Sequence, residues 1–115
     1  MAGTIKVDKW INEDGSENYK CRAWGKFLGT NTVQLEAGGN VSSITDNGVG
    51  SYTVNFINPM SDLSYSAVAS AENAASYYGI FASVLYHAIN SFAISTCTSS
   101  SSQVDGRTIN FVVFR

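Results

Sequence analysis

From Cys21 to the end of the chain, apolar and polar residues alternate in short runs separated by turn-forming clusters. Residues 51–56 read SYTVNF, three large apolar residues interleaved with three polar ones. A period of two puts the apolar side chains on one face of a half-buried β-strand. Turn clusters recur about every 8–12 residues, a spacing typical of antiparallel sandwiches and small barrels. The sequence therefore predicts an all-β fold, an antiparallel β-sandwich of about seven to eight short strands.

Composition narrows the classes of protein further. The chain has 115 residues, of which only 14% are charged, whereas coiled coils and charge-rich disordered segments need many charges. The net charge of −2 argues against nucleic-acid binding. No apolar run approaches the roughly 20 residues of a membrane span. Residues 1–9 contain no apolar signal-peptide core, so we expect synthesis in a cytoplasm and no membrane insertion.

Residues 1–20 differ from the rest of the chain. They hold nearly half of the charged residues, a polar turn cluster at 12–16 and few apolar residues. Such a segment cannot bury enough apolar surface to fold alone. We expect residues 1–20 to form an extended N-terminal arm that packs on its own domain or on a neighbour, and residues 21–115 to form the sandwich.

Several local features refine the expected sandwich. Asp46, Asn47 and Gly48 separate two alternating runs, which predicts a hairpin tip with a positive φ at Gly48. The terminal run 109–114 is apolar on both faces, as in the centre of a sheet or at a subunit interface. The predicted core residues are Leu35, Ile44, Tyr52, Val54, Phe56, Ile109, Phe111 and Val113.

Residues 74–94 fit two structures. Apolar residues at helical spacing between 80 and 89 would form one face of a helix. Aromatic and β-branched residues at 77–79 and 92–96 favour strands instead. Because the neighbouring segments are strands, we favour two strands joined near residues 87–90.

The two cysteines, Cys21 and Cys97, are expected to be small buried apolar groups. A disulfide between them is the alternative, since it would close a long loop. With His87 as the sole histidine, they cannot complete a four-ligand zinc site.

No motif in the chain indicates catalysis. His87 stands in an apolar and aromatic neighbourhood, where a structural or surface role is commoner than general-base chemistry. Asp46, Asp62 and Asp105 lie in turn contexts, where carboxylates cap backbone amides. The serines include no G-x-S-x-G elbow. We expect a protein that is not an enzyme, with no catalytic, cofactor-binding or metal site.

The aromatic residues are the better candidates for function. Exposed aromatic rings can stack on sugars or anchor protein interfaces. Trp24 is expected to pack in the core. The candidate surface or interface contacts are Trp10, Tyr77, Tyr78, Tyr86, His87, Phe92 and Phe114.

One block of sequence is similar to a known module. Residues 39–56 read GNVSSITDNGVGSYTVNF and resemble a recurrent module of phage tail-fibre and tail proteins. The match extends to the AWGKF segment at 23–27, the NPMSD loop at 58–62, the strand that starts at Tyr65 and the terminal VVFR. The opening, residues 1–9, is similar to tail-fibre openings from phages of cyanobacteria and marine bacteria.

The resemblance implies a structural protein of the virion. In this interpretation the chain is a short tail-fibre or tail-tip adhesin, a homotrimer whose arm binds other virion proteins and whose loops face the host surface, where a glycan is the candidate ligand. A capsid head decoration or cement protein is the main alternative. A carbohydrate-binding module that is free of the virion is the third.

Overall fold

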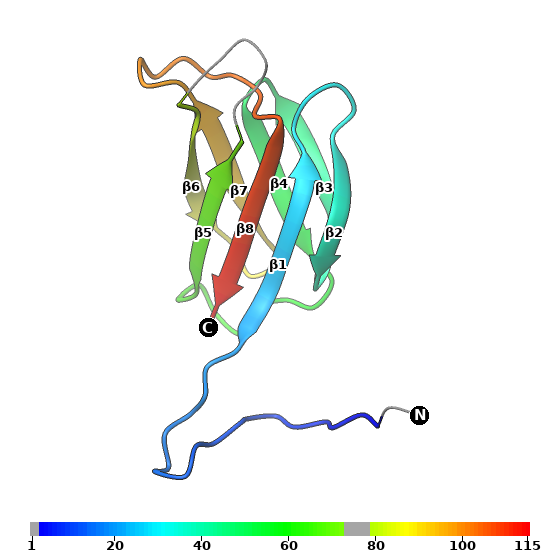
Figure 1. Ribbon diagram of the computed structural model, residues 1–115, viewed down its shortest axis with the longest axis vertical. Coiled ribbons are helices and arrows are strands. Elements are labelled where there is room, and N and C mark those ends of the chain that lie inside the picture. Colours follow the sequence, from blue (N-terminus) through cyan, green and yellow to red (C-terminus); the bar gives the residue numbers. More distant parts are fainter. Residues whose placement is uncertain (1–2, 73–78) are drawn as a thin grey trace.

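The computed structural model describes residues 3–72 and 79–115. Two antiparallel four-stranded sheets pack face to face, in the orders β2-β1-β8-β5 and β3-β4-β7-β6, which confirms the all-β sandwich (Figure 1). Its strands are β1 (Cys21–Leu28), β2 (Gln34–Gly39), β3 (Val41–Gly48), β4 (Ser51–Phe56), β5 (Ser66–Ala71), β6 (Phe81–His87), β7 (Ser91–Cys97) and β8 (Thr108–Phe114).

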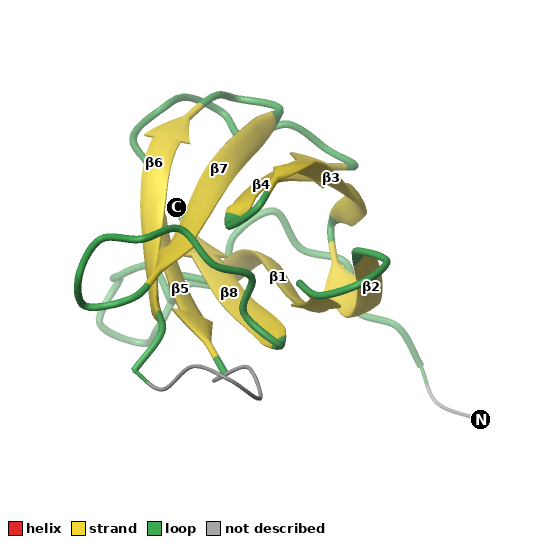
Figure 2. Cartoon of the chain, turned by 90° about the horizontal axis from the view of Figure 1, so that it is seen from above, coloured by secondary structure: helices red, strands yellow, loops and turns green. Residues whose placement is uncertain are grey.

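The core lies between the two sheets, as the view along the strands shows (Figure 2). Inward-facing aromatic rings interlock there, with Phe27 5.2 Å from Tyr52 and Phe92 5.5 Å from Phe111 between ring centroids. The predicted core residues Tyr52, Val54, Phe56, Ile109, Phe111 and Val113 are buried, and Leu35 and Ile44 pack against them partly buried.

Strand β8 occupies the centre of its sheet, between β1 and β5. Its residues Ile109, Phe111 and Val113 point into the core, whereas Val112 and Phe114 are exposed on the outer face. The expectation of a central strand is therefore confirmed, and the second apolar face of this strand is turned to the outside of the molecule.

The turns follow the expected chemistry with one change of position. Strand β3 continues to Gly48 and β4 begins at Ser51, so the tip lies at Val49 and Gly50 instead of residues 46–48. A register shift between Asp46 and Gly48 lengthens the ladder past the expected turn. Gly48 does have a positive φ of 131°.

The three turn aspartates cap backbone amides, as expected. Asp46 accepts from the amide of Gly48, and Asp62 from that of Ser64. Asp105 accepts from the amide of Gly50 at 2.9 Å. The buried Tyr52 hydroxyl lies 2.9 Å from the same Asp105 oxygen and 2.8 Å from the Gly29 carbonyl. Burial and the Asp105 carboxylate raise the pKa of Tyr52 far above its ordinary value.

Residues 80–97 settle the helix-or-strand alternative. Strands β6 and β7 form an antiparallel pair joined at residues 88–90, which confirms the favoured interpretation. Residues 73–78, where the first part of the ambiguous segment falls, lie outside the described residues.

The expectation for the cysteines is wrong for Cys21, which is exposed at the start of β1. Cys97 is partly buried at the end of β7, in the other sheet. Both are free thiols in the described structure, so the alternative of a disulfide is also wrong. The two cysteines lie at opposite ends of the sandwich, because β1 begins at the end from which the arm leaves and β7 finishes at the other end (Figure 1).

Candidate interaction surfaces

An apolar row crosses the outer face of the β2-β1-β8-β5 sheet. Trp24 is paired in register with Val112, and Val112 with Val68. Their exposed fractions are 47%, 38% and 62%. The Trp24 indole lies so close over Gly39 of β2 that an added Cβ there would collide with its ring nitrogen. We call Trp24, Val112, Val68 and Phe114 the apolar stripe.

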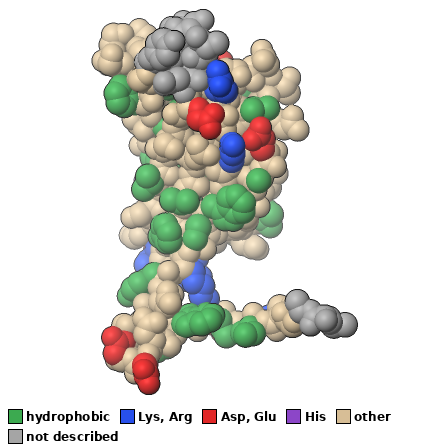
Figure 3. Space-filling view, viewed as in Figure 1, with side chains coloured by type: hydrophobic (Ala, Val, Ile, Leu, Met, Phe, Trp, Pro, Cys, Tyr) green, Lys and Arg blue, Asp and Glu red, His purple; other side chains and the backbone are tan. Residues whose placement is uncertain are grey.

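Phe114, one of the predicted contact residues, extends the stripe toward the end of β8. It is 43% exposed and follows Val112 by two residues, so both side chains share the outer face. Figure 3 shows apolar side chains gathered over the lower half of this sheet, with acidic and basic side chains above them. A shallow groove of about 370 Å³ is lined by Trp24, Val112 and Val68.

The expectation that Trp24 packs in the core is wrong. The inward positions of β1 are taken by Ala23, Gly25 and Phe27, all buried. Trp24 falls between them and must face outward, because neighbouring residues of a strand point to opposite faces.

Residues 3–20 form an arm that belongs to neither sheet and runs away from the sandwich (Figure 1). A turn at 12–16 reverses the chain, with the Asn12 amide donating to the Ser16 carbonyl at 2.8 Å. The Asn18 amide donates to the Trp10 carbonyl at 2.6 Å, and Lys20 reaches the Val7 carbonyl at 3.3 Å.

The arm leaves its apolar side chains in solvent. The exposed fractions of Ile5, Trp10 and Ile11 are 81%, 56% and 52%. Trp10 is thus accessible, as its role as a predicted contact residue requires. The two sides of the arm are joined by an isolated β-bridge, Ile11 to Glu17, and even a complete two-stranded hairpin has little stability of its own in water. In this structure these apolar side chains of the arm are therefore left largely uncovered by the sandwich.

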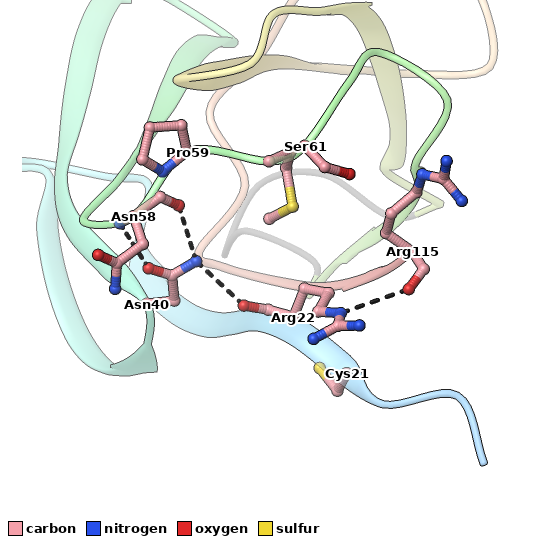
Figure 4. Close-up of a pocket in the computed structure, with 8 residues that line it drawn as sticks. Cys21, Arg22, Asn40, Asn58, Pro59, Ser61 and Arg115 are labelled. Carbon is pink, nitrogen blue, oxygen red and sulfur yellow. Dashed lines mark hydrogen bonds between the residues drawn. The ribbon is translucent and has the colours of Figure 1, made fainter. Parts of the chain in front are cut away.

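A polar groove of about 520 Å³ lies where the arm joins the sandwich (Figure 4). The side chain of Asn40 connects two segments that line this groove, at Arg22 and Asn58. The side-chain nitrogen of Asn40 donates to the carbonyls of Arg22 and Asn58, each at 3.1 Å, and its oxygen accepts from the Asn58 amide at 2.7 Å. A positive φ of 58° turns Asn40 between β2 and β3.

Both arginines of this groove face a carboxylate. Arg115 makes a two-pronged contact with Asp62, at 2.9 and 2.7 Å, and Arg22 lies 3.9 Å from Glu17. The hydrogen bonds from Arg115 lower the pKa of Asp62 to about 2. Both arginine side chains that line the groove are thus paired with carboxylates of neighbouring segments.

The other predicted contact residues differ in their surroundings. Tyr86 is 53% exposed on β6. His87 is partly covered, with its ring 4.5 Å from that of Tyr65. Phe92 is wrong as a surface contact, because it lies on the inner face of β7, fully buried against Phe56 and Phe111. Tyr77 and Tyr78 lie outside the described residues.

Sequence analysis missed Val68 and Val112 as surface residues. A signal was present at Val68, which stands among serines on the polar side of an alternating run, where an apolar residue has no place in the core. For Val112 the signal was the run itself, which is apolar on both faces and so left open a sheet centre or a subunit interface.

The arm and the apolar stripe both offer apolar contacts to a partner surface. Among residues 3–72 and 79–115, no three His, Cys, Asp or Glu side chains gather as a metal site. The same residues include no helix long and apolar enough to cross a bilayer. Comparisons with protein-family models, with curated proteins and with solved structures give no match for this chain.

Proposed function

We propose that this chain is a structural protein of a phage virion, a short tail-fibre or tail-tip adhesin. The observation that carries the proposal is the arm, whose apolar side chains extend away from the sandwich and are exposed. The resemblance of residues 39–56 to the tail-fibre module supports it. The arm attaches the sandwich to its neighbours in the particle.

Burial energetics favour an assembled state. Each large apolar side chain that becomes fully buried contributes about 1.5–3 kcal/mol. Ile5, Trp10 and Ile11 in the arm and Trp24 and Val68 in the stripe are all about half exposed or more. Both surfaces belong to one chain, so a subunit assembly, for which we propose a homotrimer, covers them together.

The arrangement of the arm and the loops at opposite ends of the sandwich supports an adhesin. The arm leaves from the end of the sandwich where β1 begins, and the β1–β2, β3–β4 and β7–β8 connections lie at the opposite end (Figure 1). The β7–β8 connection carries the run 98–103, TSSSSQ, whose hydroxyl and amide groups can hydrogen-bond to a host-surface glycan. Rigid scaffolds commonly present binding loops in this way.

Localisation in the particle tests the proposal. Purified particles of the phage that encodes this chain are labelled with gold-tagged antibody against residues 21–115 and viewed by negative-stain microscopy. We expect label on the tail. Label on the head would replace the tail proposal with a decoration role, and unlabelled particles would remove the virion role altogether.

A deletion separates attachment from folding. We expect a chain that lacks residues 1–20 to fold and yet fail to enter particles, because the arm supplies the attachment. Undiminished incorporation of this variant would contradict attachment by the arm. The free carbohydrate-binding module predicts that deletion of the arm changes nothing in the particle.

A further inference from the structure

The four edge strands of the sandwich are protected unequally. In the described part of the chain, β2 and β5 are the edges of one sheet, and β3 and β6 those of the other. Exposed edges offer free backbone hydrogen-bonding groups, and natural proteins blunt them with charges, prolines or bulges. Register shifts interrupt the pairing of three of these edge strands with their neighbours. They lie between Lys26 and Phe27 in the β1–β2 pair, at two places in the β3–β4 pair, and between Val84 and His87 in the β6–β7 pair.

Strand β5 is the exception. Its sequence, SAVASA, has no charge, proline or glycine. It pairs with β8 in one unbroken register over all six residues, from Ser66 opposite Phe114 to Ala71 opposite Ile109. Glu36 in β2 and Asp46 in β3 have no counterpart in it, and β6, which also lacks acidic and basic residues other than His87, has an interrupted register instead. The apolar stripe also ends at this edge, with Val68 62% exposed. A regular, uncharged edge beside an uncovered apolar row is a template for an added strand.

The chain itself carries a segment suited to this edge. Residues 4–9 read TIKVDK and, in the described structure, belong to no strand. Alternation puts Ile5 and Val7 on one side and Lys6 and Asp8 on the other. When this strand is hydrogen-bonded to β5 with Ile5 and Val7 on the outer face of the sheet, these two side chains lie beside Val68. The apolar stripe then extends across one more strand.

The donor is a second copy. In Figure 1 the free end of the arm lies toward the β2 side of the sheet, whereas β5 forms the opposite edge. An arm that reaches the β5 edge of the next copy makes a head-to-tail contact, which closes into a ring when the rotation suits it. Three such contacts would produce the trimer proposed above.

We infer that the β5 edge binds residues 4–9 from the arm of a second copy as an added antiparallel or parallel strand. The inference rests on the assembly role proposed for the arm and identifies its partner. Residues 10–19, with Trp10 and Tyr19 exposed, remain for other proteins of the particle. Purified protein suffices for the tests, so they can fail independently of localisation in the virion.

Light scattering on the full chain at high micromolar concentration is the first test. We expect a mass that is a multiple of 12.3 kDa for the natural sequence. Val68→Lys and deletion of residues 1–10 should both reduce it to that of the monomer. Leu85→Lys is the matched control, because Leu85 is a similarly exposed aliphatic residue on the other sheet's edge strand β6, and it should leave the oligomer intact. A monomeric natural chain, or an oligomer that survives deletion of the arm, overturns the inference.

Disulfide trapping is the second test and does not depend on a lysine being tolerated. In a background with Cys21→Ser and Cys97→Ser, a chain with Val7→Cys is mixed with a differently tagged chain with Val68→Cys. We expect a cross-linked pair that carries both tags under mild oxidation. Leu85→Cys replaces Val68→Cys in the control and should give at least tenfold less product. Equal yields at both edges would exclude β5 as the acceptor.

Discussion

Phe92 of β7 and Phe114 of β8 show that the face of the strand on which a side chain lies decides whether it is buried or exposed. Both are aromatic residues of central strands. Phe92 faces the opposite sheet and is fully buried, whereas Phe114 lies at the end of β8 on the outer face and is 43% exposed. Their residue type is the same, so composition alone cannot assign the first to the core and the second to an interface.

The core role of Phe92 is testable by truncation. We expect Phe92→Ala to lower the free energy of unfolding by about 3–5 kcal/mol, because the ring fills a fully packed site. Tyr86→Ala, at an exposed aromatic position, should change it by less than about 0.5 kcal/mol. Urea denaturation of both variants measures the difference, and similar losses would contradict the burial assigned to Phe92.

The Asp62–Arg115 contact predicts a dependence of stability on pH. The pKa of Asp62 falls from 3.8 to about 2 on folding, so the unfolded chain binds more protons between these values. Stability from this pair is therefore present above about pH 4 and is lost as the pH falls toward 2. We expect Asp62→Asn to lose less stability than the natural chain over this range.

Urea denaturation at several pH values in this window measures that effect. Arg115→Gln is the companion variant, because it removes the largest cause of the lowered pKa and keeps the carboxylate. It should flatten the acid dependence less than Asp62→Asn does, because the Ser64 amide still donates to Asp62. Parallel pH profiles for all three proteins would show that the contact is not maintained in solution.

At the scale of elements, the β3–β4 turn depends on the backbone of Gly50. Its φ is +66°, and an added Cβ would lie 2.5 Å from the Thr96 carbonyl oxygen. Its amide donates to Asp105, and its carbonyl accepts from the Thr96 amide. The turn therefore links β4 to β7 and to the connection that precedes β8.

We expect Gly50→Ala to destabilise the sandwich by more than about 2 kcal/mol. Left-handed strain alone costs about 1–2 kcal/mol, and the collision with Thr96 adds to it. Gly15→Ala is the matched control. Gly15 also has a positive φ, +89°, yet among the described residues an added Cβ there meets open space. Thermal unfolding compares the two, and equal effects would show that crowding at Gly50 is relieved by movement.

At the scale of the molecule, the two sheets turn different surfaces outward. The outer side of β3 and β4 is a polar ladder, where the amide of Asn55 donates to the Thr45 hydroxyl and that of Asn47 to the Thr53 hydroxyl. The outer side of the other sheet carries the apolar stripe. The β3-β4-β7-β6 sheet also has exposed apolar residues at its edge strand β6, such as Phe81 and Leu85. The polar ladder on β3 and β4 is why the proposed subunit contact is assigned to the β2-β1-β8-β5 face.

The arm and the sandwich should also separate in stability. We expect deletion of residues 1–20 to change the unfolding free energy of the monomer by less than about 0.5 kcal/mol, because both sheets begin after the arm. Deletion of residues 108–115 should abolish folding, since it removes the central strand β8. Circular dichroism at low micromolar concentration tests both, and a large loss on deletion of the arm would mean that it packs on its own sandwich.

The sequence alone determined the class of the fold and most of its core. Alternation at 51–56 identified the inward face of that strand, because a strand's period of two is a local property. The run 109–114, apolar on both faces, indicated a sheet centre or an interface. Turn chemistry likewise identified the capping roles of Asp46, Asp62 and Asp105. Tertiary structure decided the rest: which strands lie beside each other, and hence that Trp24, Val112 and Val68, far apart in sequence, form one row. Register between distant strands is a non-local property that no local pattern encodes, and it is what turns scattered side chains into a surface.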